Sequence, residues 1–365
     1  MMKRFLYLML LFAVLASSTR AADRDLLSWT ELPPIPDPLG FAGPFAGVHN
    51  DVVIVAGGAN FPRPVWENDK VWHDRIFVMT RDGEKYHWKE SGTLKRPVAY
   101  GASVSTEDGV VCIGGNDSEE TFDDVFLLSW DAESQRVATT DYPSLPKPCA
   151  FTAATIIGDV IYLAGGQSGP SLETAMTNFW SLDLAKKGSR DEFVWKELPA
   201  WPGPSRALNL TVSQHNGDND CVYVISGRRQ EGPADEPSSC EFLRDVWEFN
   251  PSKGGWRQRS DAPRCSMAGT SIKYGKSQIL VLGGATGELF FQGDVLKDNH
   301  PGFGNQATVY HTITDTWTSA GETAINQVTT TAIQWGDDII VPTGEVRPRT
   351  RTPKVYRVAV KRAKP

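Results

Sequence analysis

The sequence predicts an all-β chain that closes into a six-bladed β-propeller, and three observations support this prediction. The 365 residues include 33 Gly, 24 Pro and 12 Trp, a composition typical of many short strands joined by turns. No long stretch has apolar residues at helical spacing, which argues against a helical or βαβ chain. Finally, one pattern of four apolar residues followed by a small pair recurs six times. A repeat of this length is typical of propellers, in which each copy forms one blade.

Each copy of the repeat contains the elements of a four-stranded blade. A strand of small residues precedes the apolar run, an acidic or polar residue opens a third strand after it, and a strand containing Trp follows. The small pairs begin at Gly57, Gly114, Gly165, Ser226, Gly283 and Thr343, and are spaced by 57, 51, 61, 57 and 60 residues. This order of strands resembles that of Kelch repeats over residues 29–360. The resemblance implies antiparallel blades of the Kelch type.

The two ends of the chain predict how the ring closes. The sixth copy has three strands, near 327–334, 338–343 and 354–360, and the chain then stops without a Trp strand. The missing strand is found at the other end, in residues 29–32. We therefore expect the N-terminal strand to complete the last blade, which leaves no exposed edge strand across the ring.

The N-terminus has the features of a signal peptide. Lys3 and Arg4 precede an apolar run, and small residues follow up to Ala21. We predict a signal peptide over 1–21, a single propeller domain over 22–365, and export to the periplasm or outside the cell. The run is too short to favour a membrane anchor. Without it the chain has 34 basic and 44 acidic residues, a net charge of −10, which argues against nucleic acid and anionic membranes as partners.

No cofactor is expected from the sequence. The five cysteines form no CxxC pair, so a zinc site is unsupported. In an exported protein Cys221 and Cys240 could form a disulfide, or all five could be buried thiols. The histidines are scattered, which argues against a copper site, and no dinucleotide or phosphate-binding motif is present.

Basic residues recur where the chain enters four of the innermost strands: Arg96, Lys147, Arg206 and Arg264. In an acidic protein, a partial ring of cations around one mouth of the channel suggests an anionic ligand. The alternative is that each cation pairs with an acid of a neighbouring blade.

The last loop, residues 344–352, combines one carboxylate with three guanidinium groups. Glu345 follows the small pair directly, and Arg347, Arg349 and Arg351 come within the next six residues. A carboxylate in such a place can transfer protons while an arginine holds an anionic group. The same residues could also form an ordinary surface salt bridge.

This loop resembles the active loop of the N-acetylneuraminate epimerases, which are exported six-bladed Kelch propellers. Their pattern of Gly-Glu, a basic residue with Pro, and Arg-Thr is matched by Gly344-Glu345, Arg347-Pro348 and Arg351-Thr352. The family's extended loop after Gly-Gly-Ala is matched by residues 57–61. In other members the active loop lies in the middle of the chain, so we expect this chain to be a cyclically permuted member. The mid-chain loop at Gly227 continues with Arg instead of Glu.

The resemblance implies interconversion of the α and β anomers of a small acidic sugar, N-acetylneuraminate, with no cofactor and no metal. It implies that Glu345 is the general base and that Arg351 holds the sugar carboxylate. We expect Arg206, Arg264 and Asn60 to assist in binding.

A propeller of this kind admits two alternatives to this activity. A non-catalytic Kelch module could bind an acidic glycan or a protein with the same rim. A sialidase-like hydrolase is disfavoured because its Ser-x-Asp-x-Gly-x-Thr-Trp repeats are absent.

Two groups of aromatic residues have different expected roles. One group recurs once per blade, which indicates packing: Trp88, Trp195, Trp256 and Trp317. The other group lies in long loops and contains candidates for ligand contact: Trp66, Trp72, Phe290 and Phe291.

Overall fold

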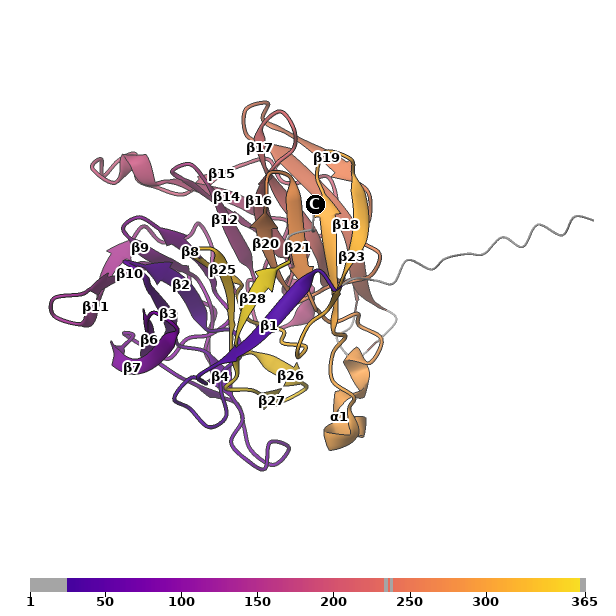
Figure 1. Cartoon of the computed structure of the whole chain (residues 1–365). Helices are drawn as coiled ribbons and strands as arrows, with labels where there is room; N and C mark the ends of the chain where they lie inside the picture. The colour runs from indigo at the N-terminus through magenta and orange to yellow at the C-terminus, as the bar shows by residue number, and fades with distance from the viewer. Residues whose placement is uncertain (1–24, 233–235, 237–238, 362–365) are drawn as a thin grey trace, which may run out of the picture.

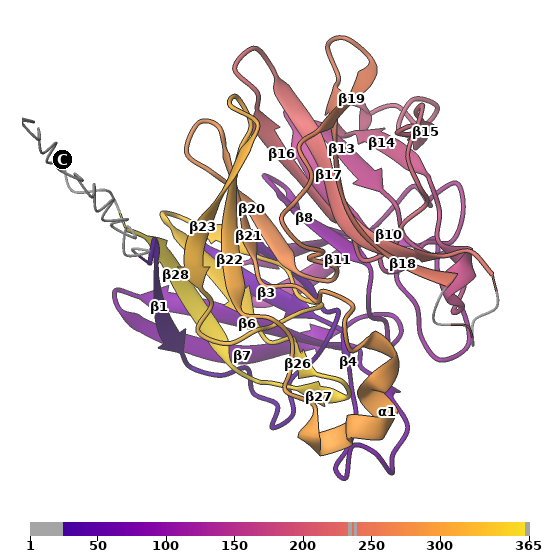
Figure 2. The same cartoon turned by 90° about the vertical axis from the view of Figure 1, so that its right-hand side faces the viewer.

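The computed structural model describes residues 25–232, 236 and 239–361; the predicted signal peptide lies outside them. Six four-stranded antiparallel sheets surround a central channel (Figures 1 and 2), which confirms the predicted fold. From the innermost strand outward, the first three blades are β2 (Phe45–His49), β3 (Val52–Ala56), β6 (Arg75–Asp82) and β7 (Lys85–Thr93); β8 (Ala102–Thr106), β9 (Gly109–Ile113), β10 (Val125–Asp131) and β11 (Arg136–Tyr142); and β12 (Ala153–Ile157), β13 (Val160–Ala164), β14 (Phe179–Asp183) and β15 (Lys196–Glu197).

The fourth and fifth blades follow the same order. They are β16 (Leu210–His215), β17 (Asp220–Gln230), β18 (Cys240–Asn250) and β19 (Gly255–Arg259); and β20 (Thr270–Tyr274), β21 (Gln278–Leu282), β22 (Gln306–His311) and β23 (Thr316–Glu322). Short helices η1 (Leu172–Thr174) and η2 (Leu184–Lys186) lie on either side of β14 in the chain. Among the described residues, no helix is long and apolar enough to cross a membrane.

The sixth blade joins the two ends of the chain. It consists of β24 (Ile333–Trp335), β25 (Asp338–Pro342), β28 (Val355–Val360) and the N-terminal β1 (Leu27–Leu32), which pairs with β28 from Leu27–Val360 to Leu32–Val355. The predicted closure is therefore confirmed. The innermost strand begins later than its predicted start at 327, because Val328 and Thr329 make backbone bonds at the channel mouth.

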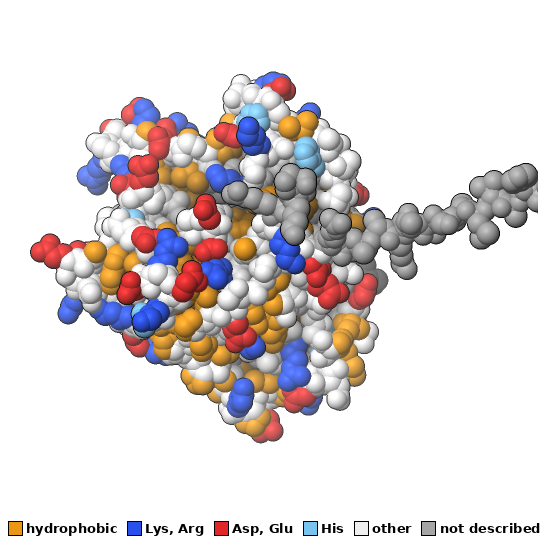
Figure 3. All heavy atoms as spheres, viewed as in Figure 1, with side chains coloured by type: hydrophobic (Ala, Val, Ile, Leu, Met, Phe, Trp, Pro, Cys, Tyr) orange, Lys and Arg blue, Asp and Glu red, His pale blue; other side chains and the backbone are white. Residues whose placement is uncertain are grey.

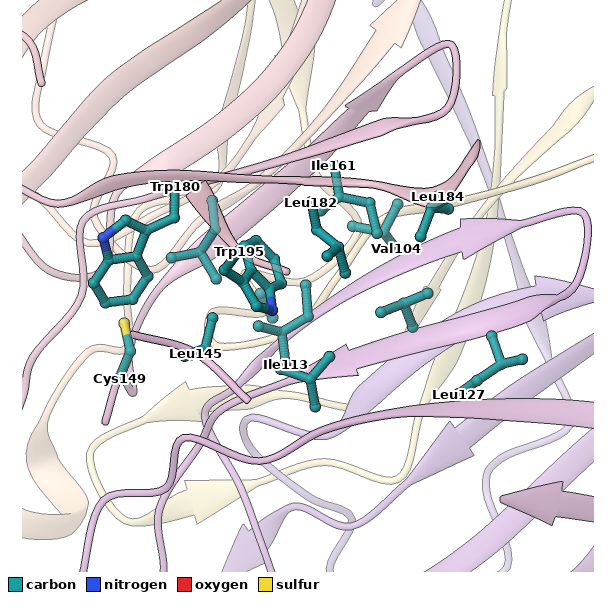
Figure 4. Packing of buried hydrophobic residues seen from close by; sticks show 14 residues of the cluster. Val104, Ile113, Leu127, Leu145, Cys149, Ile161, Trp180, Leu182, Leu184 and Trp195 are labelled. Atoms are coloured by element: carbon teal, nitrogen blue, oxygen red, sulfur yellow. The ribbon is translucent and has the colours of Figure 1, made fainter. Parts of the chain in front are cut away.

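Apolar side chains pack between neighbouring blades. Figure 4 shows the cluster between the second and third blades, where Ile113 and Leu127 face Ile161, Leu182 and Trp195. The recurring tryptophans add a directional contact between blades, since each indole N–H donates to a backbone carbonyl near the end of the preceding blade. These bonds join Trp29 to Glu322, Trp88 to Pro33, Trp195 to Pro143, Trp256 to Pro199 and Trp317 to Ser260, at 2.8–3.1 Å. These contacts between blades agree with the packing role that the sequence predicts for the recurring tryptophans.

A closed circle of backbone hydrogen bonds links all six blades at one mouth of the channel. Each blade contributes one residue just before its innermost strand, and each N–H donates to the carbonyl of its neighbour at 2.6–2.8 Å. The six residues are Gly43, Tyr100, Phe151, Leu208, Ala268 and Thr329, with φ between 53° and 65° for all of them. Five of the six are not glycine, although this backbone region disfavours other residues. The circle therefore holds strained positions in place and gives the mouth a fixed frame.

Long loops cover the same mouth. They contain the hairpins β4–β5 (Ala59–Asn60 and Val71–Trp72) and β26–β27 (Glu345–Arg347 and Thr350–Arg351). A third loop contains η4 (Phe290–Gln292), α1 (Gly293–Leu296) and η5 (Lys297–Asn299), and Figure 2 shows α1 beside β26–β27. On the face seen in Figure 3, acidic and basic side chains are interspersed.

All five cysteines are free and buried, so the buried-thiol alternative describes this structure and the Cys221–Cys240 disulfide is not formed. Within the described ranges, no group of three or more His, Cys, Asp or Glu side chains could hold a metal ion.

Candidate active site

Equivalent positions around the mouth carry different side chains. The residue after each small pair forms a bridge with the segment that leads into an innermost strand. These residues are Ala59, Asn116, Gln167, Arg228, Ala285 and Glu345. The backbone is thus the same at six places, and the chemistry of the mouth depends on which side chain each blade supplies.

Glu345 and Arg351 are cross-strand partners in the β26–β27 hairpin. The Glu345 Oε1 atom accepts a hydrogen bond from Arg351 Nη1 at 2.8 Å and another from the Arg349 backbone N–H at 3.0 Å. Two residues of a short hairpin therefore place a carboxylate and a guanidinium in contact. The motif predicted this proximity, because a turn at 348–349 brings residues six apart together.

Each nitrogen of the Arg351 guanidinium has a hydrogen-bond partner. Besides Glu345, it donates to Tyr100 Oη at 3.2 Å and to the Ala59 carbonyl at 3.3 Å, and it lies 4.9 Å from the centre of the Phe61 ring. Its side chain is only 3% exposed. Burial acts to lower the pKa of Arg351, but Glu345 and Tyr100 outweigh burial and raise it, so the group stays charged.

The expected role of Arg351 therefore needs correction. In this structure each nitrogen of Arg351 already donates one hydrogen bond, to Glu345, Tyr100 or Ala59, and the side chain is buried, so it presents no open fork to a sugar carboxylate. Its geometry is that of a positioning residue, which fixes the carboxylate of Glu345 in place.

A cavity of about 640 Å³ lies next to Glu345, above the fifth blade. Its wall includes Glu345, Arg264, His300, Phe290, Phe303 and Pro348. Leu208, Ala268 and Thr329 of the backbone circle line both this cavity and the central channel, so the two spaces adjoin. A volume of this size, with apolar walls and a few polar groups, suits a small ligand.

Arg264 is the cation that borders this cavity. Its Nη2 donates to the Gln306 carbonyl at 2.5 Å and to the Gly283 carbonyl at 3.4 Å, while its Nε has no partner. Burial lowers the pKa of Arg264, and no described carboxylate pairs with it. A half-buried guanidinium with no acid beside it is suited to receive an anionic group.

Arg206 and Asn60, expected to bind substrate, are instead structural. Arg206 is fully buried, with its guanidinium bonded to both carboxylate oxygens of Asp245 at 2.6 and 3.1 Å and to the Ser226 carbonyl. Asn60 is 2% exposed; its amide donates to the Gly40 carbonyl, and its oxygen bonds with His73. Both side chains are used within the fold, so neither is available to a ligand.

The predicted ring of cations is likewise not a ligand site as a whole. Arg96 lies near Glu120 and Asp124 at 3.5 and 3.6 Å, and Lys147 is exposed. Arg96 and Arg206 pair with acids of the blade whose innermost strand they precede, and not with those of a neighbouring blade as the alternative expected. No described carboxylate pairs with Lys147 or Arg264, and of the four cations only Arg264 lines the cavity of Glu345.

Of the loop aromatics, Phe290 lines the cavity, whereas Trp66 lies beside Arg349 and Trp72 beside Lys70. His300 was not expected to contribute to the site. It lies in a loop that no other blade repeats, so the repeat pattern could not predict that it belongs to the site. Only the folded structure shows that it lies in the same cavity as Glu345.

Comparisons with known proteins show which family this chain resembles. A family model described as N-acetylneuraminate epimerase matches residues 15–137 and 142–301. The N-acetylneuraminate epimerase of Pasteurella multocida (strain Pm70) is 30% identical over 150 residues, 41% of this chain and 34% of that protein. That of Vibrio cholerae serotype O1 is 35% identical over 123 residues, 30% of this chain and 32% of that protein. The aligned parts thus span about a third of the relatives' length.

A solved structure titled "Structure of YjhT" superposes with a TM-score of 0.66 at 14% identity, covering 91% of this chain and 98% of that one. It supports the fold. Glu345 and Arg351 lie beyond the residues that the family model matches, and the cyclic permutation stays a prediction. Because the family model matches more than half of the sequence, the chain belongs to the N-acetylneuraminate epimerase family.

Proposed function

We propose that this protein interconverts the α and β anomers of N-acetylneuraminate by opening and reclosing the sugar ring. The relatives bear the name of that activity. The observation that carries the proposal is the carboxylate of Glu345, held 2.8 Å from Arg351 in the wall of a cavity that Arg264 also lines.

The reaction requires one proton to move between two oxygens on the same carbon. Glu345 takes the proton of the anomeric hydroxyl, the bond between the anomeric carbon and the ring oxygen breaks, and Glu345 returns the proton to that oxygen. The open keto form then rotates and recloses on its other face by the reverse steps. A positioned base of this kind contributes roughly 10²–10⁴-fold.

The other two residues of the site have separate tasks. Arg351 fixes the position of the Glu345 carboxylate through the 2.8 Å bond. Arg264, which has no carboxylate partner among the described residues, binds the carboxylate of the sugar. Arg351 and Arg264 thus have separate roles in the proposed reaction.

We further propose that the protein acts after export, in the periplasm or outside the cell, and that the first 21 residues are removed. The support is the sequence of that segment.

The test is time-resolved proton NMR of freshly dissolved N-acetylneuraminate. Wild-type protein should accelerate anomer equilibration, and Glu345→Gln should lose about 10²–10⁴-fold of that acceleration. The matched control is Glu90→Gln, which removes a carboxylate paired with Arg75 at 2.8 Å on an outer strand and should behave as wild type. If folded wild-type protein gives no acceleration, the proposed reaction is wrong and a non-catalytic binding module becomes the leading interpretation.

A further inference from the structure

His300 lies in the same cavity as Glu345 but comes from a different blade. It follows η5 in the loop between β21 and β22 of the fifth blade, whereas Glu345 belongs to the sixth. Its backbone N–H donates to the Lys297 carbonyl at 3.1 Å, and its ring lies 6.1 Å from that of Phe303. The residue is 6% exposed, and what remains open borders the cavity.

One nitrogen of the His300 ring already takes part in a hydrogen bond within the protein. Nδ1 accepts a hydrogen bond from the Gly302 backbone N–H at 3.1 Å. A nitrogen that accepts cannot carry a hydrogen, so the neutral ring carries its hydrogen on Nε2. No described residue forms a hydrogen bond with Nε2, and Nε2 is not a fully buried atom that lacks a partner. The Nε2–H group is therefore free to donate to a ligand.

The surroundings of His300 keep the ring neutral. Burial is the main cause that lowers its pKa, and the Arg347 guanidinium lowers it further, while Glu345 acts in the opposite direction. Arg347 is itself held by Asp298, two residues before His300, at 2.9 Å. A second proton would have to enter at Nδ1, where the Gly302 N–H already points.

We propose that His300 is a second catalytic residue of this site, which donates a hydrogen bond from Nε2 to the ring oxygen of the sugar as that oxygen becomes negative. This inference rests on the proposed function. When the bond between the anomeric carbon and the ring oxygen breaks, its electron pair stays on the oxygen. Nε2–H stabilises that charge and keeps its own proton, and Glu345 supplies the proton that the oxygen finally receives. Such preorganised donors typically contribute about 10²–10³-fold to kcat.

The test compares two substitutions of His300 in the full chain by NMR of anomer equilibration over a range of sugar concentrations. His300→Phe keeps a ring but no donor, and kcat should fall about 10²–10³-fold with little change in KM. His300→Gln places a neutral N–H donor near the position of Nε2, and should recover at least a tenth of wild-type kcat. Thermal unfolding of both variants shows whether they are folded.

The outcomes separate this inference from the proposed function. If wild type accelerates the reaction and His300→Phe equals wild type, His300 has no catalytic role. If Phe and Gln variants are equally impaired, His300 is not a simple donor, and the inference is likewise overturned. If wild type itself is inactive, it is the proposed function that fails.

A measurement on the wild-type ring does not depend on either variant folding. Nitrogen NMR of protein labelled with ¹⁵N-histidine, with the His300 signal identified by its loss in His300→Gln or His300→Phe, should show a neutral ring protonated at Nε2 at pH 7. A ring protonated at Nδ1, or on both nitrogens, would contradict the proposal.

Discussion

Replacing Arg351 by Met tests whether this arginine acts on the substrate or on Glu345. The substitution keeps an unbranched apolar side chain and removes the donors to Glu345, Tyr100 and Ala59. Losing one partner of a buried ion pair costs about 3–5 kcal/mol. Because the Glu345 side chain is 16% exposed and keeps the Arg349 N–H, we expect the lower end, ~3 kcal/mol of unfolding free energy.

The kinetic consequence distinguishes the two roles. A base displaced by about 1 Å loses roughly 10²-fold in rate, so kcat of Arg351→Met should fall by this factor while KM stays within about threefold. Arg264→Met should instead raise KM and leave kcat nearly unchanged. Loss of a charged hydrogen bond of about 1.5–3 kcal/mol to the substrate raises KM about 10- to 150-fold.

Initial rates of anomer equilibration, followed by NMR at several sugar concentrations, give both constants. Arg96→Met is the matched control, since Arg96 occupies the corresponding place in the second blade and pairs with acids outside the cavity. A rise in KM for Arg351→Met as large as that for Arg264→Met would refute the positioning role.

Two further predictions concern the fold. Burial raises the pKa of Cys149 and Cys221 to about 12, and all five thiols are free, so Ellman's reagent at pH 8 should detect no thiol in native protein and five after denaturation; three after denaturation would indicate a disulfide. In the closing strand, Leu32→Ala should cost about 2–5 kcal/mol, because Leu32 is 5% exposed within a packed cluster. The exposed Thr30→Ala on the same strand should change stability by less than about 0.5 kcal/mol. Urea unfolding measures both variants, and equal effects would mean that β1 does not bury Leu32.

The sequence was sufficient for the ring because each blade repeats the same local pattern. Six apolar runs with small pairs predict six blades, and the unmatched Trp29 segment predicts that β1 pairs with β28, as it does. Such features depend on strand periodicity, which is local in sequence.

The site was harder to predict because burial and pairing depend on other blades and loops. Arg206 and Arg264 have equivalent positions in the repeat. However, Arg206 forms an ion pair with Asp245, whereas Arg264 donates hydrogen bonds only to backbone carbonyls. The Asn60 side chain forms hydrogen bonds with Gly40 and His73, and the spacing of residues in the sequence does not show these contacts. The Glu345–Arg351 pair could be predicted because both residues belong to one short hairpin.

The segment between β1 and β2 also holds the candidate base, Glu345, in place. In this segment, Phe41 accepts a hydrogen bond from the Gly344 N–H at 2.8 Å, and the Phe41 N–H donates to Thr343 Oγ1 at 2.7 Å. Glu345 follows these two residues directly, so the N-terminal segment holds the backbone from which the carboxylate projects. Closure of the ring and geometry of the site are therefore one structural problem.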